Sequence, residues 1–320
     1  MKTITLDLTP EDRYIVFSDC HRGDGSAGDE FARNSLLYKC ALEHYLGHGF
    51  TYIELGDAEE LWENASFEPI YITHTSIYEL LRAFHHADPE RTRYVKIWGN
   101  HDLDWKDGVG PLQPVFPGIV VYEAALIRCG ERRDERAGAS GGRRNILLLH
   151  GHQADPICSG WRARLSRSMV RHLWRGVQAV GIGDLTRAAE NPGLCNDIDA
   201  TLAGWAKNGD YEGLGLPPNS SVVAGHTHRP VFENLSLTER RLLEAGFGPP
   251  GIVRKERAEK LYYNSGSCVH PRCITGLEIT AELEEKGGIR RCLTLVKWCV
   301  KPQAHGRRYP LAIERIILQE

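Results

Sequence analysis

Five short apolar runs, each followed within two residues by aspartate, histidine or asparagine, limit how this chain can fold more than any other feature. The five junctions are Tyr14–Ser18 into Asp19-Cys20-His21, Tyr52–Gly56 into Asp57, Tyr94–Trp98 into Gly99-Asn100-His101-Asp102, Ile146–Leu149 into His150-Gly151-His152, and Val222–Gly225 into His226-Thr227-His228. Short apolar runs bounded by glycine predict buried strands. Because α/β folds place ligands just past the carboxyl ends of their strands, we expect the five strand ends to face one site.

The segments between these runs predict an α/β fold in a single domain spanning residues 1–320. Helices are expected over residues 29–47 and 69–87. In the first, six side chains are expected to face inward: Phe31, Leu36, Leu37, Ala41, Leu42 and Tyr45. The acidic residues after Asp57 favour a helix start over residues 58–63, with Glu60 complementing the helix dipole rather than supporting the site.

Residues 153–217 interrupt the strand pattern and are expected to form an inserted helical cap. On a helical wheel one face is apolar, with Trp161, Leu165, Met169, Leu173, Val177 and Val180, and another is basic, with Arg164, Arg167, Arg171 and Arg175. The basic face can recruit an anionic headgroup or a membrane surface, or can simply be solvated. The apolar face can cover an acyl chain or pack on the sheet. A further helix is expected over residues 198–207.

After His228 the pattern alternates between apolar and polar residues, which favours an antiparallel second sheet. The expected strands are residues 260–264, 274–283, 292–300 and 313–318. Residues 131–144 are polar and glycine-rich, so we predict a loop there and assign it no function.

The composition argues against some partners and compartments. With 39 Lys+Arg against 42 Asp+Glu, the formal charge of -3 gives no electrostatic case for nucleic acid. The nine cysteines include no Cys-x-x-Cys pair, which favours reduced thiols. No apolar run approaches the roughly 20 residues of a membrane-spanning helix, and the N-terminus lacks a signal-peptide core. We therefore expect a cytoplasmic protein, with any membrane contact peripheral, at the inner face.

The polar residues at the strand ends are of the types that bind metal ions. Seven are candidate ligands: Asp19, His21, Asp57, Asn100, His150, His226 and His228. Seven protein ligands exceed what one ion can accept beside a substrate, so we expect two ions. Two ions bridged by a carboxylate can clamp the attacking and leaving oxygens of an in-line displacement at phosphorus. Imidazole, carboxylate and amide ligands without thiolate suit manganese, iron, zinc, cobalt or nickel better than calcium or magnesium. The ligand types do not choose among these five metals, of which we expect manganese first.

In their order over residues 14–267, these motifs resemble those of the calcineurin-like metallophosphoesterases. The resemblance implies a four-layer αββα sandwich of two mixed sheets, and hydrolysis of a phosphoester or pyrophosphate by a hydroxide that two metals activate. The implied ligands are Asp19, His21 and His228 for the first metal and Asn100, His150 and His226 for the second, with Asp57 bridging. It also implies that His101 is not a ligand but a proton donor or a stabiliser of developing charge.

Two segments are similar to the UDP-2,3-diacylglucosamine pyrophosphatase branch of lipid A synthesis: Gly56-Asp57-x-x-Glu60-x-Trp62 and Gly225–Pro230. That branch typically carries arginine where this chain has His101 and an acid where it has His152. The implied substrate is a phosphorylated small molecule or a nucleotide-linked lipid. The candidate substrate contacts are Arg229 and the cap residues Arg164, Arg167 and Arg171.

Several assignments have alternatives. The whole chain can be a non-catalytic metal-binding scaffold with the same fold. His152 suits a substrate or ligand contact as well as a structural role, and Arg229 suits a phosphate contact as well as a surface ion pair. His44 and His48, four residues apart, are expected on a solvated helix face, and Cys20 is expected in the core.

Overall fold

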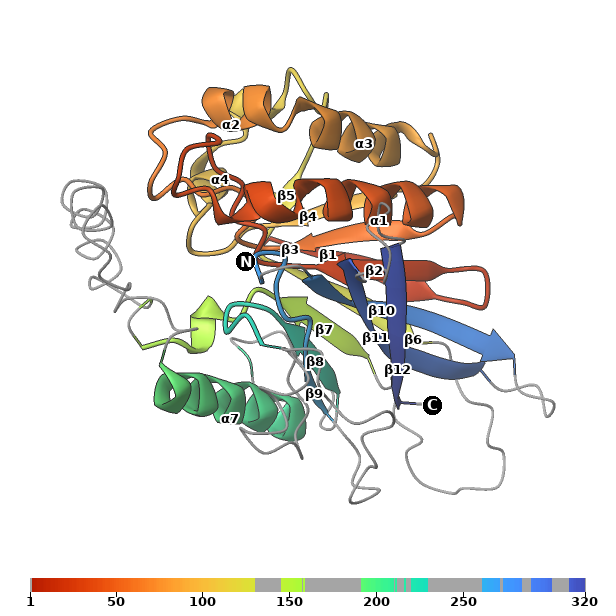
Figure 1. Cartoon of the computed structure of the whole chain (residues 1–320). Coiled ribbons are helices and arrows are strands. Elements are labelled where there is room, and N and C mark those ends of the chain that lie inside the picture. Colours follow the sequence, from red (N-terminus) through yellow and green to blue (C-terminus); the bar gives the residue numbers. More distant parts are fainter. Residues whose placement is uncertain are drawn as a thin grey trace, which may run out of the picture.

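The computed structural model describes residues 2–129, 145–156, 158, 191–209, 211, 216, 220–229, 261–270, 273–283, 289–300 and 311–319 (Figure 1). Its α-helices are α1 (Ser35–Gly47), α2 (Phe67–Thr73), α3 (Thr75–His86), α4 (Asp104–Asp107) and α7 (Pro192–Asn208). Its 3-10 helices are η1 (Glu30–Asn34), η2 (Gly110–Leu112) and η3 (His152–Ala154).

The described strands form two mixed sheets. The seven-stranded sheet has the order β12-β11-β10-β2-β3-β4-β5, and the five-stranded sheet the order β1-β6-β7-β8-β9. The strands of the first are β2 (Arg13–Phe17), β3 (Thr51–Leu55), β4 (Tyr94–Ile97), β5 (Val121–Tyr122), β10 (Cys273–Leu283), β11 (Ile289–Val300) and β12 (Leu311–Gln319). Those of the second are β1 (Thr3–Leu8), β6 (Ala124–Cys129), β7 (Ile146–Leu149), β8 (Ser221–Ala224) and β9 (Tyr262–Asn264).

The two sheets pack face to face, and helices cover their outer faces (Figure 1). Val16 of β2 and Leu148 of β7 belong to the core between the sheets. The neighbouring residue Phe17 belongs to the core that α1 and α3 cover. On the other sheet Leu147 shares a core with Leu202 of α7. Alternate strand residues therefore fill different layers, and the predicted αββα arrangement of two mixed sheets is confirmed.

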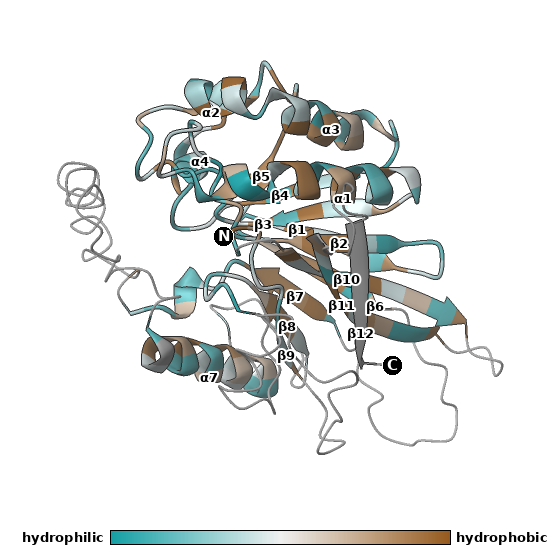
Figure 2. Cartoon of the chain, in the orientation of Figure 1, coloured by the Kyte–Doolittle hydropathy of each residue, from teal (hydrophilic) through white to brown (hydrophobic). Residues whose placement is uncertain are grey.

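Burial on both faces explains why the central strands read as continuous apolar runs. β7 is hydrophobic along its whole length in Figure 2, and all four of its residues are buried. The outer helix α3 instead alternates hydrophilic and hydrophobic residues, with Ile77, Tyr78, Leu81 and Phe84 buried. Apart from charged residues such as Glu54 and Lys96, these strands are apolar, and the candidate ligands lie just past their ends.

The helices differ from the prediction in three places. Residues 29–47 form η1 followed by α1, and Leu36 is 71% exposed rather than inward. The buried side of α1 is centred on Leu37, Ala41 and Tyr45, and Leu36 lies about 100° away from Leu37 on the helix. Residues 69–87 are divided at His74 into α2 and α3. The expected helix at 58–63 is wrong, because these residues form an isolated bridge and turns.

The strands expected after His228 are present, but they do not form a separate antiparallel sheet. β10, β11 and β12 are antiparallel to one another, and β10 also pairs with β2, so they extend the seven-stranded sheet. β9 instead pairs in parallel with β8 in the other sheet. An alternating pattern indicates which face is buried but not which strand is the neighbour, and this explains the error.

The expected cap falls mostly outside the described residues. The face from Trp161 to Val180, with Arg164, Arg167 and Arg171, is not among the described residues. The predicted loop over residues 131–144 is not among them either. Within 153–217 the structure describes the end of η3 and the helix α7, which includes the helix expected over 198–207. Among the described residues no helix is long and apolar enough to cross a membrane.

A fully buried group of four charges joins the strands that carry the site. The Arg22 guanidinium lies 2.8 Å from Glu54 and 2.7 Å from Glu59, and the Lys96 ammonium lies 2.7 Å and 2.8 Å from the same two carboxylates. Trp105 Nε1 also donates to Glu59 over 2.9 Å. Burial raises the pKa of Glu54, but Arg22 and Lys96 outweigh it and hold that pKa far below its usual range. The charges balance, so all four residues can be buried together.

Replacing Lys96 with methionine is expected to destabilise the protein by about 3–5 kcal/mol, because two buried carboxylates then share one cation. Urea denaturation measures the loss. The matched control is Lys39→Met in the exposed Lys39–Glu43 pair, 3.9 Å apart, where less than about 1 kcal/mol is expected. A Lys96→Met protein as stable as the control would contradict the role given to this group.

The carboxylate of Asp29 fixes the glycine-rich loop that follows the first ligand strand. Its Oδ2 accepts from Gly25 N at 3.0 Å and lies 2.9 Å from His74 Nε2, and its Oδ1 accepts from Ala32 N at 3.0 Å. Burial raises the pKa of Asp29, but these partners outweigh it and lower the pKa below the ordinary 3.8. The break between α2 and α3 at His74 therefore has a cause, since that ring is turned inward to this carboxylate.

Asp29→Asn is expected to cost about 1–3 kcal/mol at neutral pH. The folded-state pKa is lowered, so the carboxylate contributes its stability above pH 3.8 and loses it as the pH falls through the folded value. The difference between wild type and variant should therefore shrink in acid. Denaturation curves at pH 7 and pH 3 test this, and a difference that is the same at both would contradict it.

Candidate metal centre

The five strand-end loops meet at the carboxyl ends of β2, β3 and β4 in one sheet and of β7 and β8 in the other. Backbone bonds tie the loops together: Asp19 N donates to Gly56 O over 3.1 Å, and Gly225 N donates to His150 O over 2.9 Å. The turn after β9 supports them, since Asn264 Nδ2 donates to Gly225 O over 2.6 Å. The structure thus brings all five predicted loops to one place.

The backbone is strained at the candidate ligands. Among the described residues, the non-glycine positions with positive φ are Asp19 (53°), His21 (47°), Asp57 (49°), His226 (68°) and His228 (55°). All five are among the seven predicted ligands. Such conformations cost on the order of 1 kcal/mol or more each and persist at functional sites where the surroundings hold them. The strain is evidence for a site that is independent of the sequence motifs.

The first group of ligand atoms consists of Asp19, His21 and His228, which lie within 4.8 Å of one another. His228 Nε2 lies 3.1 Å from His21 Nε2 and 3.3 Å from Asp19 Oδ1. Ligands about 2.1 Å from one ion lie about 3 Å apart when they meet at a right angle. The spacing therefore fits a single ion held by these three side chains.

The second group consists of Asp57, His150 and His226, which also meet within 4.8 Å. His150 Nε2 lies 3.0 Å from Asp57 Oδ2, and the rings of His150 and His226 are 5.2 Å apart. Asn100 belongs to the neighbouring loop, and its Oδ1 is buried without a hydrogen-bond partner. An amide oxygen left unpaired in this position suits a metal ligand.

Asp57 lies between the two groups. Its Oδ2 is 3.0 Å from His150 Nε2 and 3.7 Å from His21 Nε2, so one oxygen faces a ligand of each group. Its Oδ1 accepts from His101 N over 2.8 Å. Burial raises the pKa of Asp57, but His150 and His101 outweigh it and hold the pKa well below its usual range. Asp19 Oδ1 also lies near both groups, 3.3 Å from His228 Nε2 and 3.9 Å from His150 Nε2, but the contacts of Asp57 are the shorter.

Hydrogen bonds on the far side of two rings determine which nitrogen faces the centre. His150 Nδ1 lies 2.9 Å from Leu55 O, and because a carbonyl only accepts, this nitrogen carries the proton. His21 Nδ1 lies 2.8 Å from the carboxylate of Glu60. In both rings Nε2 is left to bind a metal, which is the arrangement found behind most metal-binding histidines.

The centre fits a cation. His150 Nε2 is fully buried and has no partner in hydrogen-bond geometry, although Asp57 lies 3.0 Å away. Burial lowers the pKa of His150, but Asp57 and Asp19 outweigh it and raise the pKa to about 10. The two carboxylates thus give this position a negative potential that suits a cation. Buried imidazole, carboxylate and amide donors suit divalent transition metals.

His101 lies beside the ligands and shares the Glu60 carboxylate with His21. Its Nδ1 is 2.8 Å from Glu60, and its ring is 4.5 Å from that of His21. Trp62 stacks on it at 4.2 Å, with 19° between the rings, and donates from Nε1 to Asn100 O over 2.6 Å. The ring is therefore held rigidly, with Nδ1 engaged and Nε2 directed away from Glu60.

The role that the sequence analysis gave to Glu60 is wrong. We expected it to begin a helix, but it is buried, and its carboxylate binds His21 and His101 together. Burial raises the pKa of Glu60, but His101 and His21 outweigh it and hold the pKa far below its usual range. The acidic run that suggested a helix start contains one residue for the buried charge group, Glu59, and one for the centre, Glu60.

Three glycines are required because the loops approach one another closely. A Cβ at Gly99 would collide with Asp57, one at Gly225 with Asp19 and Ser18, and one at Gly56 with the His150 ring. The glycines of the sequence motifs are thus needed for packing against ligands rather than for turning the chain alone.

The remaining predicted residues have mixed outcomes. His152 is buried beside Trp98 and His150, with ring distances of 5.1 Å and 5.4 Å, and its Nδ1 has no partner, so both of its interpretations stay open. Arg229 is half-buried directly after His228, and its role stays a prediction. Cys20 is fully buried in the core under α1, as expected.

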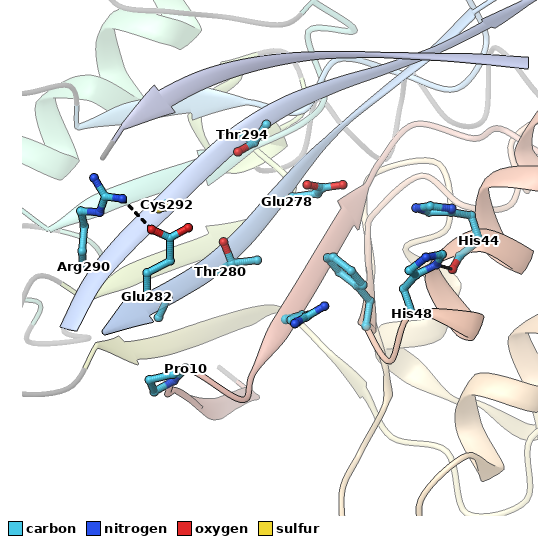
Figure 3. A pocket seen from close by; sticks show the side chains of 12 residues that line it. Pro10, His44, His48, Glu278, Thr280, Glu282, Arg290, Cys292 and Thr294 are labelled. Atoms are coloured by element: carbon cyan, nitrogen blue, oxygen red, sulfur yellow. Dashed lines mark hydrogen bonds and ion pairs between the residues drawn. The ribbon is translucent and has the colours of Figure 1, made fainter. Parts of the chain in front are cut away.

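His44 and His48 lie elsewhere. They line a hollow of about 500 Å³ between α1 and the strands β10 and β11 (Figure 3). Arg13, the first residue of β2, also lines it, whereas the ligands follow the last residue of β2, so the hollow is at the opposite end of the strand. The rings of His44 and His48 are 4.1 Å apart, and His48 Nδ1 donates to His44 O. Neither belongs to a metal-binding group among the described residues.

Comparisons with known proteins add little. No protein-family model matches the chain, and no curated protein matches it. Among solved structures, Vps29 of Chaetomium thermophilum has a TM-score of 0.37 at 12% identity, covering 96% of this chain and 98% of that one. The same protein in complex with the RaPID-derived cyclic peptide RT-D3 has a TM-score of 0.33 at 12% identity, covering 96% and 97%. These values are too low to support a functional argument.

Proposed function

We propose that this chain is a hydrolase of phosphoesters or phosphoanhydrides with a centre for two divalent metal ions. The observation that carries the proposal is the position of Asp57, whose Oδ2 faces His150 of one ligand group and His21 of the other. A carboxylate shared by two adjacent cation sites is the feature that a dinuclear centre needs and a single structural ion does not.

The ligand sets support this chemistry. The first ion would be held by Asp19, His21, His228 and Asp57, and the second by Asp57, Asn100, His150 and His226. Two ions bound there supply Lewis acidity that activates water and stabilises charge on a phosphoryl group. Manganese is our first choice among the divalent metals that such ligands suit, and iron, zinc, cobalt and nickel also suit them.

His101 is proposed to give a proton to the leaving oxygen. Glu60 engages Nδ1 and stabilises the positive form of the ring, so Nε2 can carry the proton that is transferred. Stacking on Trp62 restricts the ring to one orientation. His101 is not needed to hold a metal in this arrangement, because its ring already has partners on one edge and one face.

We also propose a class of substrate, which is a more specific proposal than the reaction type. A nucleotide-linked lipid such as UDP-2,3-diacylglucosamine follows from the motif resemblance, with Arg229 and the cap residues Arg164, Arg167 and Arg171 as contacts. Peripheral attachment at the inner membrane face and a cytoplasmic location belong to the same proposal. A phosphorylated small molecule is the alternative that needs none of these contacts.

The test is hydrolysis of three compounds, each with added Mn²⁺: p-nitrophenyl phosphate, bis-p-nitrophenyl phosphate and UDP-2,3-diacylglucosamine. Cleavage of any of them that is abolished by chelation and restored by metal supports the proposal. Faster cleavage of the lipid nucleotide than of the small esters would support the lipid substrate. No turnover of any compound, with two metals bound, would contradict an enzymatic role and favour a metal-binding scaffold.

A further inference from the structure

We infer that Asp155 is a positioning residue that fixes the ring of His226 for the second metal. Its Oδ2 lies 2.9 Å from His226 Nε2, and both side chains are buried, at 1% and 6% exposure. Asp155 is not one of the motif residues. It follows η3, five residues after His150, and its backbone N donates to His152 O. The inference rests on the proposed dinuclear centre.

The contact selects one ring nitrogen. An ionised carboxylate can only accept, so His226 Nε2 carries the proton and Nδ1 is left with the lone pair. The ring of His226 also offers one nitrogen within 4.8 Å of ligand atoms of Asp57 and His150. Nδ1 is therefore the ligand atom that this ring can offer, whereas His21 and His150 offer Nε2.

The backbone of His226 is fixed as well. Its N–H donates to both carboxylate oxygens of Asp19, at 3.1 Å and 3.0 Å, and its φ of 68° is strained. Asp19, a first-group ligand, thus holds the main chain, while Asp155 holds the far edge of the ring. Rotation of the His226 ring about its side-chain bonds would break its contact with Asp155. Asp155 therefore fixes the orientation of the ring, which the backbone contacts alone do not.

Charge explains why a carboxylate is used. In the first group, His21 has the Glu60 carboxylate behind its ring, and Asp19 is itself a ligand. In the second group, His150 has only the neutral Leu55 carbonyl behind it, and Asp57 is shared. Asp155 supplies the second group with a negative charge one imidazole away from the ion, which raises the basicity of the ligand.

A competing arrangement uses the same atoms. Asp155, Cys158 and His226 also place ligand atoms within 4.8 Å of one another and could together hold a metal. That site would need His226 Nε2 without its proton, so it conflicts with Nδ1 as the ligand of the second ion unless the ring loses both protons. The two arrangements differ in their dependence on the Cys158 thiol and in the ring nitrogen that binds the metal.

The experiment is Mn²⁺ titration of the metal-free full chain, followed by calorimetry, for wild type, Asp155→Asn, Asp155→Ala and Asp199→Asn. We expect Asp155→Ala to weaken one of two Mn²⁺ equivalents by about 10–100-fold and to leave the other unchanged. Asp155→Asn keeps an acceptor but not the charge, so an intermediate loss is expected. Asp199, buried at 5% exposure and bonded to Tyr262 OH over 2.9 Å, is the control for removing a buried carboxylate.

Equal weakening of both equivalents, or none, would overturn the inference. So would a metal equivalent that is taken up with Zn²⁺ and lost in Cys158→Ser, because Asp155 would then be a ligand. Imidazole ¹⁵N spectra of the metal-free protein give a readout that does not depend on the centre: His226 is expected to carry its proton on Nε2. The opposite tautomer would refute the role of Asp155, whereas wild type that binds no metal but has this tautomer would refute only the dinuclear centre.

Discussion

Asp57→Asn is expected to lose both metals and to lower turnover by on the order of 10³-fold or more. The substitution removes the negative charge that lies closest to both ligand groups and leaves His150 and His21 without it. The amide is nearly the same size, and its oxygen can still accept from His101 N. The fold should therefore persist, and elemental analysis beside a hydrolysis assay measures the loss directly.

The matched control is Glu43→Gln, which removes a carboxylate that is half exposed and 3.9 Å from Lys39. It should keep the metals and the turnover. An Asp57→Asn protein that keeps two metals and wild-type turnover would show that Asp57 is not the bridge. His226→Ala is expected to resemble Asp57→Asn in losing turnover, because it removes a ligand of the second group.

His101→Ala is expected to keep both metals and to lose about 10²–10⁴-fold in turnover. None of the metal-ligand roles is assigned to this ring, whose Nδ1 is bound to Glu60 and whose face is covered by Trp62. The same preparation should be analysed for metal content and for the hydrolysis rate. Turnover equal to wild type would refute the proton-donor role, and loss of metal would make His101 part of the metal site.

The strand ends could be predicted from the sequence because burial on both faces makes most residues of these strands apolar. Leu147 and Leu148 of β7, for example, fill different cores on opposite sides of one sheet. The polar residues that follow such a run break its apolar pattern, so their chemistry is visible in the sequence. The convergence of the five loops follows from the parallel strands that precede them.

Residues that act through another residue could not be predicted in the same way. Glu60 and Asp155 bind the far edges of His21 and His226 across 39 and 71 positions of sequence. The buried partners Glu54 and Lys96 were equally hidden, because a charged residue in a strand reads as a solvent-facing position. Glu60 shows that an acidic residue three positions after a ligand can be turned inward, and only the fold reveals which one.

The long-range pairing of the C-terminal strands was also beyond the sequence. The alternation in β10 correctly indicated strands, but its pairing with β2 depends on contacts such as Leu277 opposite Val16. Both residues are buried in the core between the sheets. Any apolar stripe of similar length would have satisfied the same pattern, so the pattern alone did not choose the sheet.

The central claim is that two metals in one centre produce the activity, and titration of metal-free protein with Mn²⁺ tests it most directly. Hydrolysis of bis-p-nitrophenyl phosphate and p-nitrophenyl phosphate should be followed at each addition, with bound metal measured in parallel. We expect turnover to rise as the second equivalent binds and to reach its plateau at two. Full turnover without metal, or two tightly bound metals with no hydrolysis of either ester or of UDP-2,3-diacylglucosamine, would contradict the account.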